Sequence, residues 1–483
     1  MKEKSRPALL NETSLPGKRG YLPPVSNVPE LADDELIPSS LLRHTPLHLP
    51  ELSEMEVTRY FTKLSQRSFG VDQGFYPLGS CTMKYNPKFP EEIARLSGFQ
   101  DLHPLQDETS IQGALGLWYY AEKVFSLITG MDQFTLQPAA GAHGELTGLF
   151  IIKAALEDRG ETNRDTILIP DSAHGTNPAS AALAGFKVQK VPSSPEGIIE
   201  PDTLRSYLGA NIAGMMLTNP NTLGLFERNI LTITRMIHEI GGEVYYDGAN
   251  LNAILGWARP GDMGFDLVHL NLHKTFATPH GGGGPGAGPV GVKKHLAKYL
   301  PVPRVVSTSQ GFKWDYDAPY SIGKVKGFWG HFTVIIKALV YILSLGNEGL
   351  KQVSSDAVLA ANYLQTQLKE DYNLPYDSFC MHEFVLGGVK EKAPEINTLD
   401  IAKGLMDFGI HPPTIYFPLI VQEALMIEPT ESVTLKLVDT FISVMLKLAR
   451  MAVEEPEKLK EAPFTTPVRR LDEVNAARNP ILK

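Results

Sequence analysis

The sequence predicts an α/β protein with a large domain on a parallel sheet, a smaller C-terminal α+β domain and an extended N-terminal arm. At 483 residues the chain is too long for one small core. Short apolar runs alternate with helix-like segments between Asp132 and Val292, whereas the first fifty residues hold eight prolines and little periodicity. We therefore expect an arm and helical segment at 1–115, the large domain at 116–345 and the small domain at 346–483.

The arm keeps apolar residues such as Leu9, Leu15 and Tyr21 between its prolines, which favours docking on a surface over disorder. From Glu51 to about Ile128 the pattern is mostly helical. A polar, glycine-containing loop at Tyr76–Lys88 interrupts it.

The apolar runs of the large domain are rich in Val, Ile and Leu, as in parallel strands buried on both faces. We expect strands at Phe134–Leu136, Thr166–Ile169, Phe186–Val191, Ile212–Leu217, Val244–Tyr246 and Leu267–Leu272. After a helical stretch at Phe332–Leu345 the pattern becomes mixed. It predicts a strand at Phe384–Leu386 and helices at Ser354–Leu368, Leu399–Phe408 and Val433–Val453.

Composition narrows the class of protein. The net charge of -9 argues against a nucleic-acid surface. The best membrane candidate, Phe332–Leu345, is interrupted by Lys337 and is too short to span, and the N-terminus lacks an apolar signal core. Two cysteines, Cys81 and Cys380, cannot form a disulfide framework. We expect a cytoplasmic protein with no membrane or nucleic-acid partner.

Ligands of an open parallel sheet bind at the carboxyl ends of its strands, so the polar residues after each apolar run are informative. The first run is followed by Gln137–Glu145, whose small residues could expose backbone N–H groups at a helix start. Gly141, Ala142 and His143 are candidates for a phosphate cradle. A tight turn without a ligand fits the same residues.

Three residues after the next runs could contact a flat cofactor. His174 could stack on a ring, although a lone histidine is more often structural. Asn219 and Thr222 offer neutral hydrogen bonds suited to a phenolic oxygen, although Asn-Pro is also a common turn.

Asp247 ends the run Val244–Tyr246 and could pair with a pyridinium nitrogen, keeping it protonated. Ala249, two residues on, faces the same side and is small enough to let a ring lie flat. An aspartate in a surface turn would show the same local pattern.

Lys274 follows the most apolar run and precedes a glycine run at 281–284. A lysine half-buried at a strand end tends to lose its proton, as a nucleophilic amine must. The glycines allow backbone to approach a ligand closely. His269 and His273 would share a face of a strand as metal ligands, but no third ligand is evident, so no metal is expected.

The order phosphate loop, stacking residue, asparagine, aspartate and lysine resembles the aspartate-aminotransferase superfamily of pyridoxal-5'-phosphate (PLP) enzymes, fold type I. Asn219 precedes Asp247 by 28 residues and Asp247 precedes Lys274 by 27, within the usual range of that superfamily. The resemblance implies a PLP Schiff base on Lys274, with Asp247 and His174 as further catalytic residues. His273 before the lysine resembles the amino-acid decarboxylase branch.

A closer resemblance rests on four strings: Gly79–Pro87, Gln137–Glu145, His273–Phe276 and Thr466–Glu473. They are similar to glycine decarboxylase, the P-protein of the glycine cleavage system. The chain is about half as long as the single-chain P-protein and contains the lysine, which matches subunit 2 of the two-subunit form. The resemblance implies decarboxylation of glycine, release of CO2 and transfer of the aminomethyl group to the lipoyl arm of the H-protein. It also implies a partner subunit 1, in an α2β2 heterotetramer.

Two alternatives stay open. Another fold type I enzyme, such as a group II decarboxylase or an aminotransferase, would keep the cofactor residues and change the substrate groups. An aminotransferase would normally want an arginine for the substrate carboxylate, and Arg259 is near in sequence. A catalytically dead scaffold subunit would have no reason to keep the set from His174 to Lys274. In the loop, Cys81 is expected to be a buried small residue and Lys84 fits a surface charge.

Overall fold

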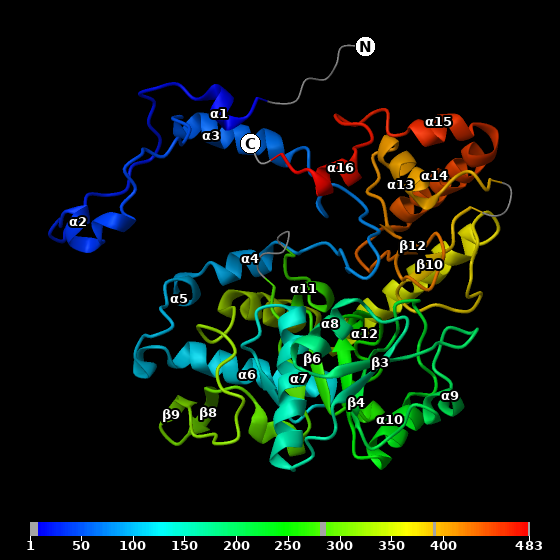
Figure 1. Ribbon diagram of the computed structural model, residues 1–483, viewed down its shortest axis with the longest axis horizontal. Coiled ribbons are helices and arrows are strands. Elements are labelled where there is room, and N and C mark those ends of the chain that lie inside the picture. Colours follow the sequence, from blue (N-terminus) through cyan, green and yellow to red (C-terminus); the bar gives the residue numbers. More distant parts are fainter. Residues whose placement is uncertain (1–7, 281–285, 390–392, 482–483) are drawn as a thin grey trace. The chain divides into compact units, whose positions relative to one another are not determined.

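The computed structural model describes residues 8–280, 286–389 and 393–481, which form two compact units (Figure 1). The smaller unit contains the residues up to Gln73 together with Thr466–Leu471. Its helices are α1 (Leu10–Thr13), α2 (Asp33–Leu36), η1 (Ser39–Leu41) and α3 (Glu54–Ser65), none of which has a buried residue. The N-terminal arm is therefore extended, as expected.

A seven-stranded sheet organises the larger unit. Its strands are β1 (Gln133–Thr135), β2 (Thr166–Pro170), β3 (Lys187–Val191), β4 (Ile212–Thr218), β5 (Glu243–Gly248), β6 (Leu267–Leu270) and β7 (Val290–Val292), in the order β1-β7-β6-β5-β4-β2-β3. The neighbours from β6 to β3 pair in parallel, whereas β7 is antiparallel to both β6 and β1. The expected all-parallel sheet is wrong at this edge, because the three-residue strand β7 is too short to stand out in the sequence.

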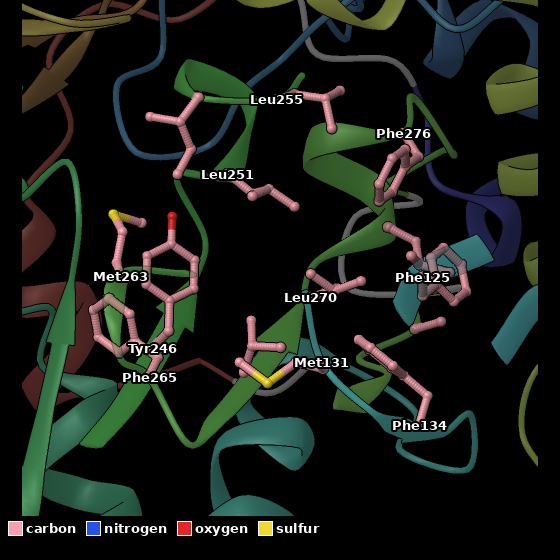
Figure 2. Close-up of a cluster of buried hydrophobic side chains, with 14 of the residues drawn as sticks. Phe125, Met131, Phe134, Tyr246, Leu251, Leu255, Met263, Phe265, Leu270 and Phe276 are labelled. Atoms are coloured by element: carbon pink, nitrogen blue, oxygen red, sulfur yellow. The ribbon is translucent and has the colours of Figure 1, made fainter. Parts of the chain in front are cut away.

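Helices cover both faces of this sheet. Successive residues of a strand point to opposite faces, so Tyr246 joins one core and Tyr245 another. The first core packs against α6 (Gln112–Thr129), α10 (Ile230–Glu239) and the start of α12 (Phe332–Leu368), and the second against α7 (Gly141–Asp158). Figure 2 shows part of the first core, where the Tyr246 and Phe265 rings meet edge to face at 4.9 Å. Burial on both faces explains the continuous apolar runs.

Short elements connect these layers. They are α4 (Phe89–Ala94), α5 (Ser97–Gln100), η2 (Glu108–Ser110), α8 (Thr176–Leu183), α9 (Pro201–Arg205), η3 (Leu251–Ala253), η4 (Pro260–Met263), α11 (Leu272–Thr275), η5 (Lys294–Tyr299), β8 (Arg304–Thr308) and β9 (Gly311–Asp315). The expected strand Leu267–Leu272 ends at Leu270, so Lys274 lies in the single turn α11 and not on a strand.

Helix α12 joins the two main cores of the larger unit. Gly346, at φ 62° and ψ -173°, breaks it between the two predicted helical stretches. Among the described residues α12 is the one helix long and apolar enough to cross a membrane by length and composition. Part of its apolar surface packs inward: Val334 and Ile335 enter the core of the large sheet, and Ala361 and Leu364 enter a second core.

The second core lies on a three-stranded antiparallel sheet in the order β10-β12-β11. Its strands are β10 (Phe384–Leu386), β11 (Thr414–Ile415) and β12 (Leu425–Ile427), and the C-terminal helices are α13 (Thr398–Asp407), α14 (Leu435–Glu454), α15 (Pro456–Glu461) and α16 (Glu473–Arg478). The predicted strand Phe384–Leu386 and the predicted helices Leu399–Phe408 and Val433–Val453 agree with β10, α13 and α14 to within two residues at each end. The helix predicted to begin at Ser354 instead continues from the break at Gly346.

Candidate active site

A cavity of about 270 Å³ lies at the carboxyl ends of the central strands. Every strand from β1 to β6 except β3 is followed by residues that line it. The lining consists of Ser80, Ala140, Gly141, Ala142, Glu145, His174, Thr176, Thr218, Thr222, Asp247, Ala249, Asn250, Asn271, His273 and Lys274. Parallel strands end at one edge of a sheet, so residues far apart in sequence meet there.

Asp247 is the buried anion of this cavity. Its Oδ1 lies 3.1 Å from Nε2 of His269 on β6 and accepts the N–H of Ala249 at 3.0 Å, while its Oδ2 accepts from Nδ2 of Asn177 at 2.9 Å. Burial alone would raise the pKa of Asp247, but the charge of His269 and these hydrogen bonds hold it well below the ordinary value. Asp247 is therefore a carboxylate.

His269 supplies the positive charge beside Asp247. Burial would lower the pKa of its imidazole, but the charges of Asp247 and Glu145 raise it above the ordinary value. Its Nδ1 lies 3.3 Å from the hydroxyl of Tyr245, which donates to the carbonyl of Gly144 at 2.8 Å. His269 is therefore the partner of the aspartate. The shared face with His273 that a metal pair would require is not formed.

Glu145 and Asn177 extend this network, and local sequence reasoning assigned neither a role. The Nδ2 of Asn177 bridges the two carboxyls, donating to Oε2 of Glu145 at 3.1 Å as well as to Asp247. Burial, followed by the charge of Asp247, raises the pKa of Glu145 to about 7. Their one available signal was position: each lies near the start of a helix that follows a strand.

The start of α7 forms the wall predicted to cradle a phosphate. Ala140, Gly141 and Ala142 line the cavity, and no side chain caps the helix at Ala140. A Cβ on Gly141 would lie 2.4 Å from Nδ2 of Asn271, so only glycine fits there. His143 is not in the lining. Its Nδ1 turns back to accept the N–H of Ala139 at 3.1 Å, which stabilises the turn.

Lys274 lines the cavity from α11, with His273 beside it. Burial, then the charges of His280 and Lys274, lowers the pKa of His273 to about 3, so this imidazole is neutral. The His273 and His280 rings meet edge to face at 4.9 Å. The glycine run at 281–284, which was predicted to approach a ligand, lies outside the described residues.

The three predicted ring contacts have different surroundings. His174 lines the cavity, and burial followed by the charge of Lys274 lowers its pKa. Thr222 also lines it and donates its hydroxyl to the carbonyl of Ser172. Asn219 is not in the lining. Its Oδ1 accepts the N–H of Glu227 at 2.8 Å, which ties down the loop after β4.

These residues fit an anionic, ring-shaped cofactor such as PLP. Thr218 Oγ1, Asn271 Oδ1 and His273 Nδ1 are buried polar atoms without a partner among the residues that the structure describes. All three side chains line the cavity, beside an uncapped helix start. A buried polar atom normally has a partner. A ligand rich in hydrogen-bonding groups, with a cationic edge for Asp247 and a carbonyl for Lys274, would satisfy this set.

Comparison with known proteins identifies the family. A protein of Caldanaerobacter subterraneus named glycine dehydrogenase (decarboxylating) subunit 2 is 60% identical over 476 residues, covering 99% of this chain and 98% of the relative. Proteins of the same name from Desulforamulus reducens and Exiguobacterium sibiricum are 57% and 56% identical, covering 98% and 100% of this chain and 98% of each relative. The chain belongs to the glycine dehydrogenase (decarboxylating) subunit 2 family. The family model described as the glycine dehydrogenase C-terminal domain matches residues 353–466.

Solved structures confirm the predicted fold type I architecture of this chain. A crystal structure of glycine decarboxylase (P-protein) of the glycine cleavage system, in inhibitor-bound form, has a TM-score of 0.72 at 19% identity, covering 86% of this chain and 94% of that one. Glutamate decarboxylase of Lactobacillus brevis has a TM-score of 0.67 at 14% identity, covering 88% and 97%. At these identities the likeness concerns the fold.

The loop Tyr76–Lys88 reaches the site, because Ser80 lines the cavity. Lys84 is buried, so the solvated surface charge that the sequence left open does not apply. Its Nζ donates to Glu431 Oε1 and Asn252 Oδ1, each at 2.6 Å, and to the carbonyl of Thr275 at 3.2 Å. Burial raises the pKa of the Cys81 thiol to about 11. Cys81 is partly buried and not fully buried as expected.

Proposed function

We propose that this chain is the lysine-bearing catalytic subunit of a PLP-dependent glycine decarboxylase. In this proposal it releases CO2 from glycine and transfers the aminomethyl group to the lipoyl arm of an H-protein. A bond forms between the aminomethyl carbon and one lipoyl sulfur while the disulfide breaks. The other sulfur becomes a thiol and stays on the lipoyl arm. The disulfide is thereby reduced.

The cofactor, when bound, supplies an electron sink for the charge left by the departing carboxylate. The residues of the chain hold and orient it. Lys274 would hold it covalently, Asp247 would keep its ring nitrogen protonated, and the helix start at Gly141 and Ala142 would bind its phosphate. His174 would lie against the ring.

The observation that carries this proposal is the cavity lining, in which Lys274 is the only lysine or arginine among the described residues. An aminotransferase would want an arginine there for the substrate carboxylate. Arg259, the nearest candidate in sequence, pairs with Asp262 at 2.7 and 3.0 Å and is not in the lining. A substrate carboxylate that leaves as CO2 is lost more readily when the site binds it weakly.

The arm supports a two-subunit enzyme. Tyr21, Leu22, Val25 and Val28 are between 62% and 92% exposed, and an apolar segment of this kind gains by docking on another chain. We infer that the partner is the homologous subunit 1, in an α2β2 assembly in the cytoplasm. A single chain that forms an active homodimer is the alternative.

Exchange of labelled bicarbonate into the carboxyl group of glycine, with lipoylated H-protein present, tests the function. The chain is assayed alone and with subunit 1. Exchange that appears only on mixing supports the proposal. Full exchange by the lone chain rejects the two-subunit form, and no exchange under either condition rejects glycine decarboxylation.

A further inference from the structure

A second group of buried ionisable side chains lies behind the cavity wall, outside the residues used above. His382, Glu383 and Glu428 are all 0% exposed. One carboxylate oxygen of each glutamate and one imidazole nitrogen lie within 4.8 Å of one another. The His382 Nε2 is 3.8 Å from Oε1 of Glu383 and 3.8 Å from Oε1 of Glu428, beyond hydrogen-bond distance.

Each carboxyl holds one backbone N–H of the loop Leu78–Lys84. Glu383 Oε2 accepts from the N–H of Ser80 at 2.7 Å, and Glu428 Oε2 accepts from the N–H of Thr82 at 2.8 Å. Ser80 and Thr82 have φ values of 63° and 49°, a left-handed conformation that costs a non-glycine residue about 1 kcal/mol or more. The hydrogen bonds to the two carboxyls therefore stabilise a loop conformation that is unfavourable by itself.

That conformation brings Ser80 to the cavity. Glu383 also contacts a second lining residue, because its Oε1 accepts from Nδ2 of Asn250 at 3.3 Å. Gly79 packs closely against β12, since a Cβ there would lie 2.2 Å from the Met426 side chain. The loop is thus clamped between the carboxyls and β12.

The charges around the pair do not balance if both carboxyls are ionised. Lys84 forms an ion pair with Glu431, and Asp247 forms an ion pair with His269. Burial lowers the pKa of His382 to about 3, so it is neutral. Lys274 faces both glutamates and Lys84 also faces Glu428, but Lys84 is paired with Glu431 and Lys274 would be bound to the cofactor in the holoenzyme. Burial raises the pKa of both carboxyls, and at Glu383 the charge of Glu428 raises it further. A buried charge without a partner of opposite charge is costly.

We propose that Glu383 and Glu428 act as one positioning unit that shares a single proton and holds Ser80 against the cavity, where its hydroxyl contacts the substrate. This inference rests on the proposed function for its substrate but not for its proton. A metal ion among the same three side chains is the competing occupant.

Infrared spectra of the holoenzyme test the proton, which needs no activity. The difference between wild type and Glu428→Gln should contain a carboxylic-acid C=O band that the variant lacks, because Glu383 ionises once its partner is neutral. The Glu383→Gln difference should contain a band of the same kind. No carboxylic-acid band in either difference spectrum, or stoichiometric bound metal, would overturn the shared proton.

A double-mutant cycle tests the positioning. Ser80→Ala and Glu383→Leu should each raise KM for glycine in the exchange assay about tenfold or more, and Glu383→Leu in the Ser80→Ala background should add less than about threefold. Glu383→Gln keeps the acceptor and should stay within about threefold of wild type. Additive losses would make Glu383 merely structural and overturn its action through Ser80. If wild type itself lacks exchange, the proposed function fails, and the infrared result still stands or falls separately.

Discussion

Asp247 and His269 are register partners on the adjacent parallel strands β5 and β6, and their side chains meet at 3.1 Å. Neighbouring residues of a parallel pair point to the same face. An aspartate at one strand end thus receives a fixed cation from the next strand. This pair sets the charge of the cavity, and several expectations depend on it.

Removing the positive charge of His269 should let the pKa of Asp247 rise. In His269→Leu we expect cofactor affinity and glycine–bicarbonate exchange to fall about tenfold or more, because one partner of a buried ion pair is lost. The acid limb of the activity profile should move to higher pH, since the pKa of Asp247 is no longer held down. Tyr245→Phe keeps the imidazole and should lose less than about threefold. An unshifted acid limb in His269→Leu would show that the ion pair does not set the charge.

Replacing the aspartate itself should have a larger effect. Asp247→Ala is expected to bind PLP more weakly and to lose exchange far more than thermal stability. Cofactor titration and melting curves measure the two effects on the same protein. Unchanged turnover would make Asp247 a residue of the turn alone.

Lys274 should be the covalent anchor. Purified wild type is expected to be yellow, and borohydride should fix the cofactor to the peptide that contains Lys274. Lys274→Ala should lose this fixable cofactor, with Lys84→Ala as the matched control that keeps it. Covalent trapping of PLP by Lys274→Ala would reject the assignment.

His174 should contribute through contact with the ring. His174→Ala is expected to weaken PLP binding about fivefold, because a stacked ring contributes about 1 kcal/mol. Fluorescence titration with PLP measures this change. Normal affinity and a normal spectrum would remove His174 from the site.

Glu145 should make stability depend on pH. Its pKa is raised from 4.5 to about 7, so its protonated form favours the folded state below pH 4.5, and that contribution is lost as pH rises through 7. Glu145→Gln should therefore melt a few degrees above wild type at pH 8 but not at pH 5. Glu157→Gln, an exposed position on the same helix, should match wild type at both pH values. An equal difference at both pH values would contradict the linkage.

Much of the fold and of the candidate site could be predicted from local sequence patterns. The apolar runs located six of the seven strands of the large sheet within about three residues, because burial on both faces leaves a continuous apolar signature. The order of polar residues after those runs predicted Lys274, Asp247, His174, Ala249, Gly141, Ala142 and Thr222, all of which line one cavity. Fold class and family were confirmed by the structure and by the relatives.

Other features depend on long-range contacts that no local window contains. The neighbours of Asp247 are Asn177, 70 residues earlier, and His269 on the next strand. His143 and Asn219 occur at suitable places in the sequence, but their side chains stabilise turns of their own backbone. Lys84 reads as a surface charge until the fold brings Glu431 from 347 residues away. Local periodicity reports which side chains are apolar. Partners of buried charges are chosen by strand register and domain packing, which only the folded chain provides.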